Sequence, residues 1–447
     1  MLRYPAYPQY SQEGLPIAWE RKRLRFALKM NPSKSEIALG ESDLVSFVPM
    51  DAVGEYGGIR LTEEKELSEI GSGYTYFRDG DVVVAKITPC FENGKGALAK
   101  RLTNKTAFGT TELHVMRANL EQLVPQFLFY LTISDLFRKM GESEMYGAGG
   151  QKRVPESFFK DFRAGIPSRD EQRTIARLLG LKTAQIDTLV VKKKVLLDKL
   201  AEKRIALISH TVTKGLDPSV PVKDSGVPWL GAIPLDWAAK RLRFLSTMSG
   251  GMTPSTGNPA YWGGIIPWIT PKDMKSDSLA GSIDTLTDEG VHETGLTLHK
   301  SGRILIVVRG MILAHTFPVA INAVPATVNQ DMKALSTSLN GEYLALLLKG
   351  IQPLVLSIVE ESAHGTKVLR TDVFKNIYLP VPPADVQVEI VKQVGSWLTA
   401  LDAQTRSIDL AIQRLQEYRS TLITNAVTGK IDVRGFQVPQ LAEGMAS

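Results

Sequence analysis

Residues 168–214 read SRDEQRTIARLLGLKTAQIDTLVVKKKVLLDKLAEKRIALISHTVTK, and the chain carries this pattern twice. Residues 159–217 align with residues 374–432 without a gap, at a constant offset of 215 positions. Many aligned positions are identical, and Gln172 and Gln387 form one such pair. A segment that is written twice predicts a structural element that is built twice.

Both copies have the apolar spacing of a coiled coil, with steps that alternate between three and four residues. The expected seam residues are Leu179, Ile186, Val190, Leu197, Leu200 and Leu207 in the first copy and Val394, Leu398, Leu401, Ile408, Ile412, Leu415 and Leu422 in the second. Ile175, Leu178, Leu189 and Leu196 widen the apolar face of the first copy. We expect the two copies to pair, and a helix of about 45 residues, on the order of 65 Å long, could act as a ruler.

The ends of both helices are signalled locally. Ser168 and Glu171 form the pattern of a capping box, in which the two side chains satisfy free backbone amides of the first turn. The second helix lacks this box and starts at Pro383 instead. Gly215 and Gly429 are stop signals for the first and second helix.

Composition and charge leave several classes of partner open. The formal charge of +6 and the pI near 9.1 permit a polyanionic partner. The single cysteine, Cys90, excludes an internal disulfide framework. The first residues, Met1 to Pro5, do not resemble a signal peptide, and the apolar runs are too short to span a bilayer. We therefore expect a soluble cytoplasmic protein with no membrane partner.

The repeat extends beyond the helices, because residues 16–26 and 234–244 share Pro, Trp and the run KRLRF. The order is lobe, helix, lobe, helix, and the fold class is mixed α+β with a pseudo-twofold internal repeat. The expected segments are a first lobe at 1–165, a first helix at 166–217, a second lobe at 218–380, a second helix at 381–432 and a tail at 433–447. Residues 217–234 read as a linker.

Each lobe shows short strands, one helix and a polar turn. In the first lobe we expect strands at 44–48, 81–87 and 113–117, a helix at 124–140 and a glycine-rich turn at 147–150. In the second lobe we expect strands at 265–269, 303–308 and 332–335, a helix at 341–351 and a turn at 364–367. The lobes differ far more than the helices, which suggests two different ligands or half-ligands.

The residues offer little for catalysis. The chain has no phosphate loop, and its six histidines lack metal-ligand spacing; we expect His292 and His299 to be solvated loop residues. Cys90 would be a nucleophile only if a histidine approached it, and a buried, inert thiol is the preferred interpretation. The acids at 63–66 fit a solvated face better than a magnesium site.

Polar residues at strand ends and in turns favour binding. Arg and Lys donate to phosphates and guanine, whereas Asn and Gln can pair with adenine. The candidate nucleic-acid contacts are Arg78, Lys86, Thr88, Asn93, Lys95, Gln151, Lys152 and Arg153 in the first lobe and Lys272, Arg309, His315, Asn329, Gln330, Thr366 and Lys367 in the second. For any one of these residues, an ordinary surface role is an equally good interpretation.

These patterns together resemble the specificity subunits of type I restriction-modification systems. The matching phrases are the two lobe openings at 16–26 and 234–244, GDVVVAK at 80–86 followed by FENGKG at 91–96, FGTTELHV at 108–115 with NQD at 329–331, the residues around Glu171-Gln172, and AVTGKI at 426–431. The resemblance covers nearly the whole chain.

The resemblance implies a non-catalytic chain that binds no cofactor of its own. Each lobe would be a target recognition domain that reads one half of a bipartite, asymmetric double-stranded DNA target. The helices would pack antiparallel as a spacer and dock two modification (methyltransferase) subunits, and two restriction subunits would complete the complex. S-adenosylmethionine, ATP and Mg would belong to those partners, which methylate adenine N6 and cleave DNA.

Two other interpretations of the chain stay open at this point. A non-enzymatic scaffold could use the coiled coil to dimerise and the lobes to bind proteins, although Arg, Lys, Asn and Gln outnumber the Tyr, Trp and Leu expected of a protein-binding hot spot. A nuclease would need acidic metal ligands that the sequence does not group together.

Overall fold

The computed structural model describes residues 4–12, 14–148 and 150–436. Three sequence predictions therefore lie in part outside the described residues: the chain start at 1–3, position 149 of the glycine-rich turn, and the tail at 437–447. The chain divides into unit 1 (Met1–Lys193 and Asp409–Ser447) and unit 2 (Lys194–Ile408). Each unit contains one lobe and part of both long helices, α4 (Arg169–Lys214) and α9 (Ala384–Val427).

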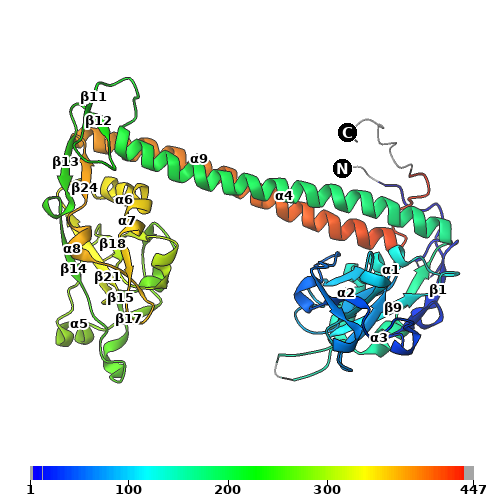
Figure 1. Cartoon of the computed structure of the whole chain (residues 1–447). Helices are drawn as coiled ribbons and strands as arrows, with labels where there is room; N and C mark the ends of the chain where they lie inside the picture. The colour runs from blue at the N-terminus through cyan, green and yellow to red at the C-terminus, as the bar shows by residue number, and fades with distance from the viewer. Residues whose placement is uncertain (1–3, 13, 149, 437–447) are drawn as a thin grey trace. The chain divides into compact units, whose positions relative to one another are not determined.

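Both long helices have the predicted extent, and within each unit they run side by side in opposite directions (Figure 1). All thirteen predicted seam residues are buried or half-buried. Of the four residues expected to widen the apolar face, Ile175 and Leu178 are buried, whereas Leu189 and Leu196 are 47% and 45% exposed. They are available to a partner, because they lie off the seam.

Two ion pairs cross between the helices at equivalent positions of the repeat. In unit 1, Arg419 Nη2 lies 3.5 Å from Asp187 Oδ2. In unit 2, Arg204 pairs with Asp402. Because Asp187 and Asp402, and Arg204 and Arg419, are related by the 215-residue offset, the two contacts are copies of each other.

The helix ends follow the predicted signals with one exception. Ser168 Oγ accepts a hydrogen bond from Glu171 N at 3.3 Å, which is half of a capping box. The Glu171 carboxylate accepts hydrogen bonds from the Tyr7 hydroxyl and from Trp19 Nε1, the latter at 3.2 Å, so it binds the N-terminal segment. The predicted second half of the capping box, in which Glu171 would bind a backbone amide of the first turn, is therefore wrong. Gly215 and Gly429 follow the helices with φ of 89° and 72°, as stop signals do.

The lobe of unit 1 is built on two four-stranded sheets, ordered β2-β9-β6-β7 and β4-β3-β8-β5, with β1 and β10 paired separately. Its strands are β1 (Glu20–Arg23), β2 (Leu28–Met30), β3 (Leu44–Val48), β4 (Glu63–Glu66), β5 (Thr75–Arg78), β6 (Val82–Ala85), β7 (Gly96–Leu98), β8 (Thr106–Gly109), β9 (Leu113–Ala118) and β10 (Arg163–Ile166). Its short helices are α1 (Pro125–Thr132), α2 (Asp135–Ser143) and α3 (Glu156–Asp161). The predicted single helix at 124–140 is two helices, because Ser134 caps α2 by accepting from Phe137 N at 3.3 Å.

The lobe of unit 2 is built on a five-stranded sheet, β14-β21-β18-β19-β16, and a three-stranded sheet, β17-β15-β20. Its strands are β11 (Val222–Asp224), β12 (Ala232–Pro234), β13 (Ala238–Arg241), β14 (Ser246–Gly250), β15 (Trp262–Ile269), β16 (Ser278–Leu279), β17 (Asp284–Leu286), β18 (Ile304–Val307), β19 (Val319–Asn322), β20 (Thr327–Val328), β21 (Met332–Thr337), β22 (Val359–Glu361), β23 (Lys367–Leu369) and β24 (Tyr378–Val381). Its helices are α5 (Asp288–Thr294), α6 (Gly341–Gly350), α7 (Gln352–Ser357) and α8 (Thr371–Phe374). The predicted linker at 217–234 contains the β11–β12 hairpin.

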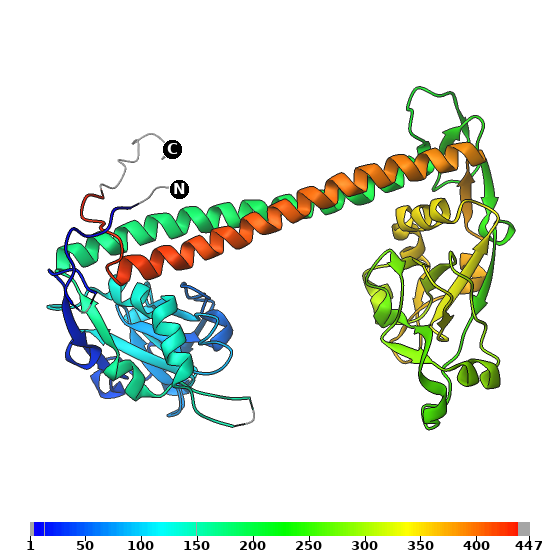
Figure 2. The same cartoon turned by 180° about the vertical axis from the view of Figure 1, so that it is seen from behind.

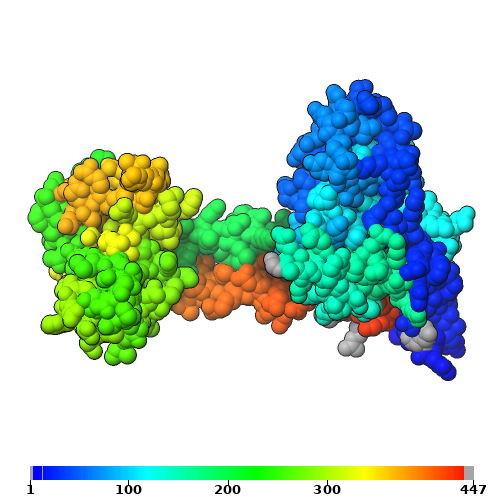
Figure 3. All heavy atoms as spheres, turned by 90° about the horizontal axis from the view of Figure 1, so that it is seen from below, coloured from blue at the N-terminus to red at the C-terminus, as the bar shows by residue number. Residues whose placement is uncertain are grey.

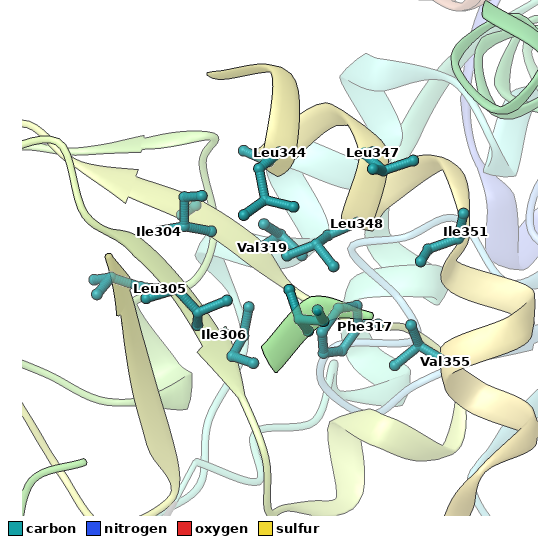
Figure 4. Packing of buried hydrophobic residues seen from close by; sticks show 14 of the residues in the cluster. Ile304, Leu305, Ile306, Phe317, Val319, Leu344, Leu347, Leu348, Ile351 and Val355 are labelled. Atoms are coloured by element: carbon teal, nitrogen blue, oxygen red, sulfur yellow. The ribbon is translucent and has the colours of Figure 1, made fainter. Parts of the chain in front are cut away.

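Helix α6 covers the large sheet of unit 2. In Figure 4, Leu344 and Leu348 lie over Ile304 and Val319 of the sheet, next to Phe317. These side chains are at most 5% exposed. The burial of such leucines and isoleucines, each worth about 1.5–3 kcal/mol, is the main force that holds the lobe together.

The two lobes attach to the long helices through equivalent residues. The core of unit 1 includes Ile175, Leu179, Ile423 and Val427 from the helices. The core of unit 2 includes the residues related to them by the offset, which are Ile390, Val394, Ile208 and Val212. The internal repeat therefore extends to the packing of each lobe on its helices.

A repeated buried glutamine joins each long helix to the first turn of a lobe helix. Gln172 Oε1 accepts from Val124 N at 2.7 Å, and Gln172 Nε2 donates to the carbonyls of Gln122 and Pro167 at 2.9 Å. Gln387 accepts from Asn340 N at 2.8 Å and donates to Pro382 O at 2.9 Å. Val124 and Asn340 are the N-caps of α1 and α6, so each glutamine accepts a hydrogen bond from the backbone amide at the start of a lobe helix.

The N-terminal segment packs beside the end of α9 in unit 1 (Figure 2) and runs over the surface of that unit (Figure 3). Asp432 N donates to Pro5 O at 2.7 Å, and the Tyr10 hydroxyl donates to Gly429 O at 3.1 Å. These contacts join the first and last described segments within one core. No helix in the described part of the chain is both long enough and apolar enough to span a bilayer.

Candidate nucleic-acid interface

A hairpin formed by residues 146–148 and 150–153 (hairpin 1) collects several of the predicted contacts of unit 1. Its two sides meet at Tyr146 and Arg153, which exchange backbone hydrogen bonds of 3.1 and 2.8 Å. Gly150 near its tip has φ of 78°, in the left-handed region that glycine occupies without strain. Gln151 and Lys152 are exposed on the returning side.

Thr88, just beyond the end of β6, holds hairpin 1 in place. Thr88 N donates to Lys152 O at 3.0 Å, and Thr88 Oγ1 donates to Gly150 O at 2.8 Å. Lys152 N donates to Thr88 Oγ1 at 3.0 Å. One threonine thus fixes the backbone of the hairpin, which leaves the Lys152 side chain at the surface.

Arg153 is the second anchor of hairpin 1. Its Nε and Nη2 donate to the two carboxylate oxygens of Glu112 at 2.9 and 2.8 Å. The hydrogen bond from Arg153 lowers the pKa of Glu112, and the nearby Lys86 lowers it further. Arg153 was predicted as a DNA contact; in the free chain its guanidinium positions the hairpin.

Strands β22 and β23 form the corresponding hairpin of unit 2 (hairpin 2, residues 359–369). Gly310 N donates to Lys367 O at 2.9 Å, as Thr88 N does to Lys152 O. Gly365 has φ of 77°, as Gly150 has at the equivalent position. Lys152 and Lys367 are therefore structural equivalents, and so are Gln151 and Thr366.

The strand-end residues beside the hairpins also correspond. Lys86 N donates to Glu112 O at 2.9 Å, and Val308 N donates to Asp331 O at 2.8 Å. Asp331, the last residue of NQD at 329–331, is therefore the structural equivalent of Glu112, the last residue of FGTTE at 108–112, as the sequence predicts. In unit 2 the neighbouring Arg309 is exposed and pairs by backbone with hairpin 2.

The side chains of hairpin 2 and its surroundings are more occupied than those of hairpin 1. Lys367 Nζ lies 2.6 Å from Glu361 Oε2, and this contact lowers the pKa of Glu361. Asn329 is 6% exposed and bonds to Asp331 at 3.2 Å and 3.1 Å. Gln330 Oε1 accepts from the Thr253 hydroxyl at 2.8 Å. A ligand of unit 2 must compete with these internal partners.

The remaining candidate residues lie at other places in the two units. Arg78 ends β5 and is exposed, and Lys95 Nζ donates to Met50 O at 3.2 Å. Asn93 lines a cavity of about 480 Å³ beside Asp187 and Arg419 of the long helices. Lys272 and His315 lie at the 3-10 turns Pro271–Asp273 and Met311–Ala314.

Two exposed apolar residues beside the hairpins were missed. Tyr146 opens hairpin 1 and is 64% exposed, and Met311 follows Gly310 in unit 2 and is 61% exposed. Tyr146 precedes the glycine-rich turn directly in the sequence, a signal that could have identified it. Aromatic and apolar side chains at such places can stack on bases or wedge between them.

The structure also bears on the predictions about catalysis. Within the described ranges, no three His, Cys, Asp or Glu side chains are grouped so that they could hold a metal ion. Cys90 is a free, half-buried thiol rather than a buried one. The prediction of a solvated loop residue is wrong for His299, which is only 7% exposed and pairs by backbone with Ala326. His292 lies within α5 rather than in a loop.

Comparisons with known proteins agree with this architecture. A family model, the type I restriction modification DNA specificity domain, matches residues 234–414. The specificity subunits of the Escherichia coli type I restriction enzymes EcoEI and EcoAI are 42% and 39% identical over 167 and 173 residues. These alignments cover 37% and 38% of this chain but only 27% and 29% of the relatives, so the matched part spans little more than a quarter of their length.

A solved structure on complex assembly and conformational transition of the type I R-M system shares the fold over nearly the whole chain. Its TM-score is 0.74, with 18% sequence identity, and the match covers 95% of this chain and 100% of that one. Local sequence similarity, the matched specificity domain and the shared fold point the same way. Residues 234–414 match the type I restriction modification DNA specificity domain, and the chain has the fold of that solved structure.

Proposed function

We propose that the chain is the DNA-recognition subunit of a type I restriction-modification complex and carries no catalytic site of its own. The observation that carries this proposal is the equivalence of hairpins 1 and 2, each of which has a glycine at φ near 78° and a lysine two residues later. Each hairpin would contact one half of a bipartite double-stranded DNA target.

The chemistry of the hairpins suits a duplex. Lys152 and Lys367 would neutralise phosphates, whereas Gln151, Thr366 and Arg309 would face base edges. Because the side chains at equivalent positions differ, the two half-sites would differ in sequence. Tyr146 and Met311 would support the bases that each hairpin touches.

The long helices would fix the spacing of the half-sites and bind the catalytic partners. α4 exposes Leu189 and Leu196 on one side and Val191 and Val195 on the opposite side, each at least 45% accessible, which offers apolar surface to partners. We assign this surface to two modification subunits, with two restriction subunits completing a cytoplasmic complex. S-adenosylmethionine, ATP and Mg would bind those partners, and the lobes at 1–165 and 218–380 would be the target recognition domains.

Methylation mapping tests the proposal directly. The chain is co-expressed with its cognate modification subunit, and modified adenines are read across the host genome. A single motif with two unlike halves and a fixed gap is expected. A stable complex without sequence-defined methylation would contradict the proposal and favour a protein-binding scaffold.

A length variant sharpens the same experiment. Inserting one heptad into both α4 and α9 should lengthen the nonspecific gap of the motif and leave both halves intact. A heptad adds about 10 Å of helix, equal to roughly three base pairs of DNA. An unchanged gap would rule out the helices as the spacer.

A further inference from the structure

Tyr56 of unit 1 lies between two arginine side chains. The guanidinium carbon of Arg138 is 4.8 Å from the centre of the Tyr56 ring, and that of Arg419 is 4.7 Å from it. Tyr56 has φ of 60°, which is unusual for a residue with a side chain. A strained backbone is retained where the surrounding contacts over-determine it.

The two arginines come from different parts of unit 1. Arg138 belongs to α2 and donates to the Tyr56 hydroxyl at 3.0 Å and to Asp135 at 2.6 Å. Arg419 belongs to α9, donates to Tyr56 O at 3.2 Å and lies 3.5 Å from Asp187 of α4. Tyr56 therefore joins the lobe to α9 directly and to α4 through Arg419.

The ring contact matters because both arginines are largely out of water. Their side chains are 12% and 14% exposed, and among the described residues their buried Nε atoms have no hydrogen-bond partner. A buried cation needs compensation, and a cation over an aromatic face provides it.

A continuous series of bonds leads from Tyr56 to hairpin 1. Tyr56 N donates to Gly94 O at 2.9 Å, and Lys95, the next residue, accepts from Ala85 N at 3.0 Å. Ala85 ends β6 and is followed by Lys86 and, two residues further on, by Thr88, the anchor of hairpin 1.

Gly94 is closely packed, so position 94 has little room for a side chain. Gly94 has φ of 72°, and a Cβ atom there would lie 3.1 Å from Arg138 Nη1 and 3.4 Å from the Tyr56 ring. The turn that was predicted to contact DNA through Asn93 and Lys95 is thus packed against Arg138 and the Tyr56 ring.

The equivalent place in unit 2 is built differently. Arg204, the copy of Arg419, pairs with Asp402 and lies 4.0 Å from Asp277. Asp277 in turn lies 2.8 Å from Lys349. An ionic cluster replaces the stacked tyrosine there, so the stacked junction is a property of the first lobe.

We propose that Tyr56 is a positioning residue that sets hairpin 1 against the long helices and so sharpens the half-site read by the first lobe. This inference rests on the proposed function. Tyr56 would touch no base and would act through Gly94, Lys95 and β6.

The test is methylation mapping of variants in complex with the modification subunit. Gln151→Ala, at a residue assigned to base edges, first identifies which half of the motif belongs to unit 1. Tyr56→Ala should then relax the sequence requirement of that same half. Sites with a disfavoured base in this half should be methylated on the order of tenfold more than by the wild-type complex, since the loss of two stacked cations corresponds to about that factor. Tyr56→Phe keeps the stacking and should stay close to wild type.

Two further variants keep the result interpretable. Arg419→Lys keeps the charge beside Asp187 but loses the flat guanidinium, so it should relax the same half more weakly. Tyr378→Ala removes a tyrosine stacked by Arg241 at 5.1 Å in unit 2, and should leave the first half unchanged.

The outcomes separate the inference from the proposed function. If wild type gives a bipartite motif and Tyr56→Ala leaves both halves sharp, or degrades both equally, the inference is overturned. If Tyr56→Ala fails to assemble, Arg419→Lys decides: a sharp first half overturns the inference, and a relaxed one supports it. A wild-type complex without a bipartite motif would refute the proposed function itself.

Discussion

The two units share a backbone design and differ in how their side chains are used. The helix contacts recur residue for residue at the 215-residue offset, as Ile175 and Ile390 do in the two cores. The hairpins share main-chain bonds and a glycine, yet Lys152 is exposed where Lys367 is paired with Glu361. The scaffold and the recognition chemistry are therefore separable in this molecule.

The largest expected difference between the units concerns their buried glutamines. Gln172→Leu would leave three backbone groups without their partner and should destabilise unit 1 by about 3–5 kcal/mol. Gln387→Leu removes the hydrogen bonds to Asn340 N and Pro382 O and should cost unit 2 about 2–3 kcal/mol. Hydrogen exchange at the Val124 and Asn340 amides would report each unit separately.

A matched control is available on the surface of α9. Gln404 is exposed, and Gln404→Leu should change stability by less than about 0.5 kcal/mol. Equal losses for Gln172→Leu and Gln387→Leu would show that the third bond, to Gln122, contributes nothing.

The next largest effect concerns DNA binding by the two equivalent lysines. Lys152→Ala should reduce the slope of log affinity against log salt by about 1, because one phosphate contact releases about one counterion. Lys367→Ala should reduce it by less, since this lysine must first leave Glu361. Fluorescence anisotropy across a salt series on the whole complex would measure both slopes.

The reciprocal change tests the same reasoning from the other side. Glu361→Gln frees Lys367 and should raise DNA affinity, whereas Lys203→Ala, on the exposed face of α4, should leave the salt slope unaltered. A lower affinity for Glu361→Gln would mean that the pair shapes hairpin 2 for binding rather than competing with it.

A smaller, pH-dependent difference is expected at the anchor of hairpin 1. Arg153 lowers the pKa of Glu112, so the pair stabilises the hairpin above the ordinary carboxyl pKa and is lost as pH falls through the lowered value. Hydrogen exchange at Lys152 N should show the hairpin opening as the pH falls below the ordinary carboxyl pKa and through the lowered pKa of Glu112. Glu112→Gln should open it already at neutral pH and leave hairpin 2 unaffected.

The sequence predicted the parts of the molecule that follow from periodicity and repetition. Both long helices, their glycine stops and the seam residues are as expected, because a repeated heptad pattern and local capping rules determine them. The side-chain partners of Arg153, Lys367 and Asn329 were out of reach, because they depend on residues brought together only by folding. Tyr56 was missed because its partners Arg138 and Arg419 are 82 and 363 positions away.

The smallest expected difference concerns the two interhelical ion pairs. Exposed pairs contribute at most about 1 kcal/mol, and both aspartates are about half exposed. Asp187→Asn should cost less than Asp402→Asn, because Arg419 keeps its contacts with Tyr56 whereas Arg204 keeps only a 4.0 Å contact with Asp277. Double-mutant cycles with Arg204→Ala and Arg419→Ala, read by urea unfolding at low and high salt, would isolate each coupling energy. If Asp187→Asn proved the costlier change, the stacked tyrosine would not be what holds Arg419, and the contrast between an aromatic and an ionic junction would fail.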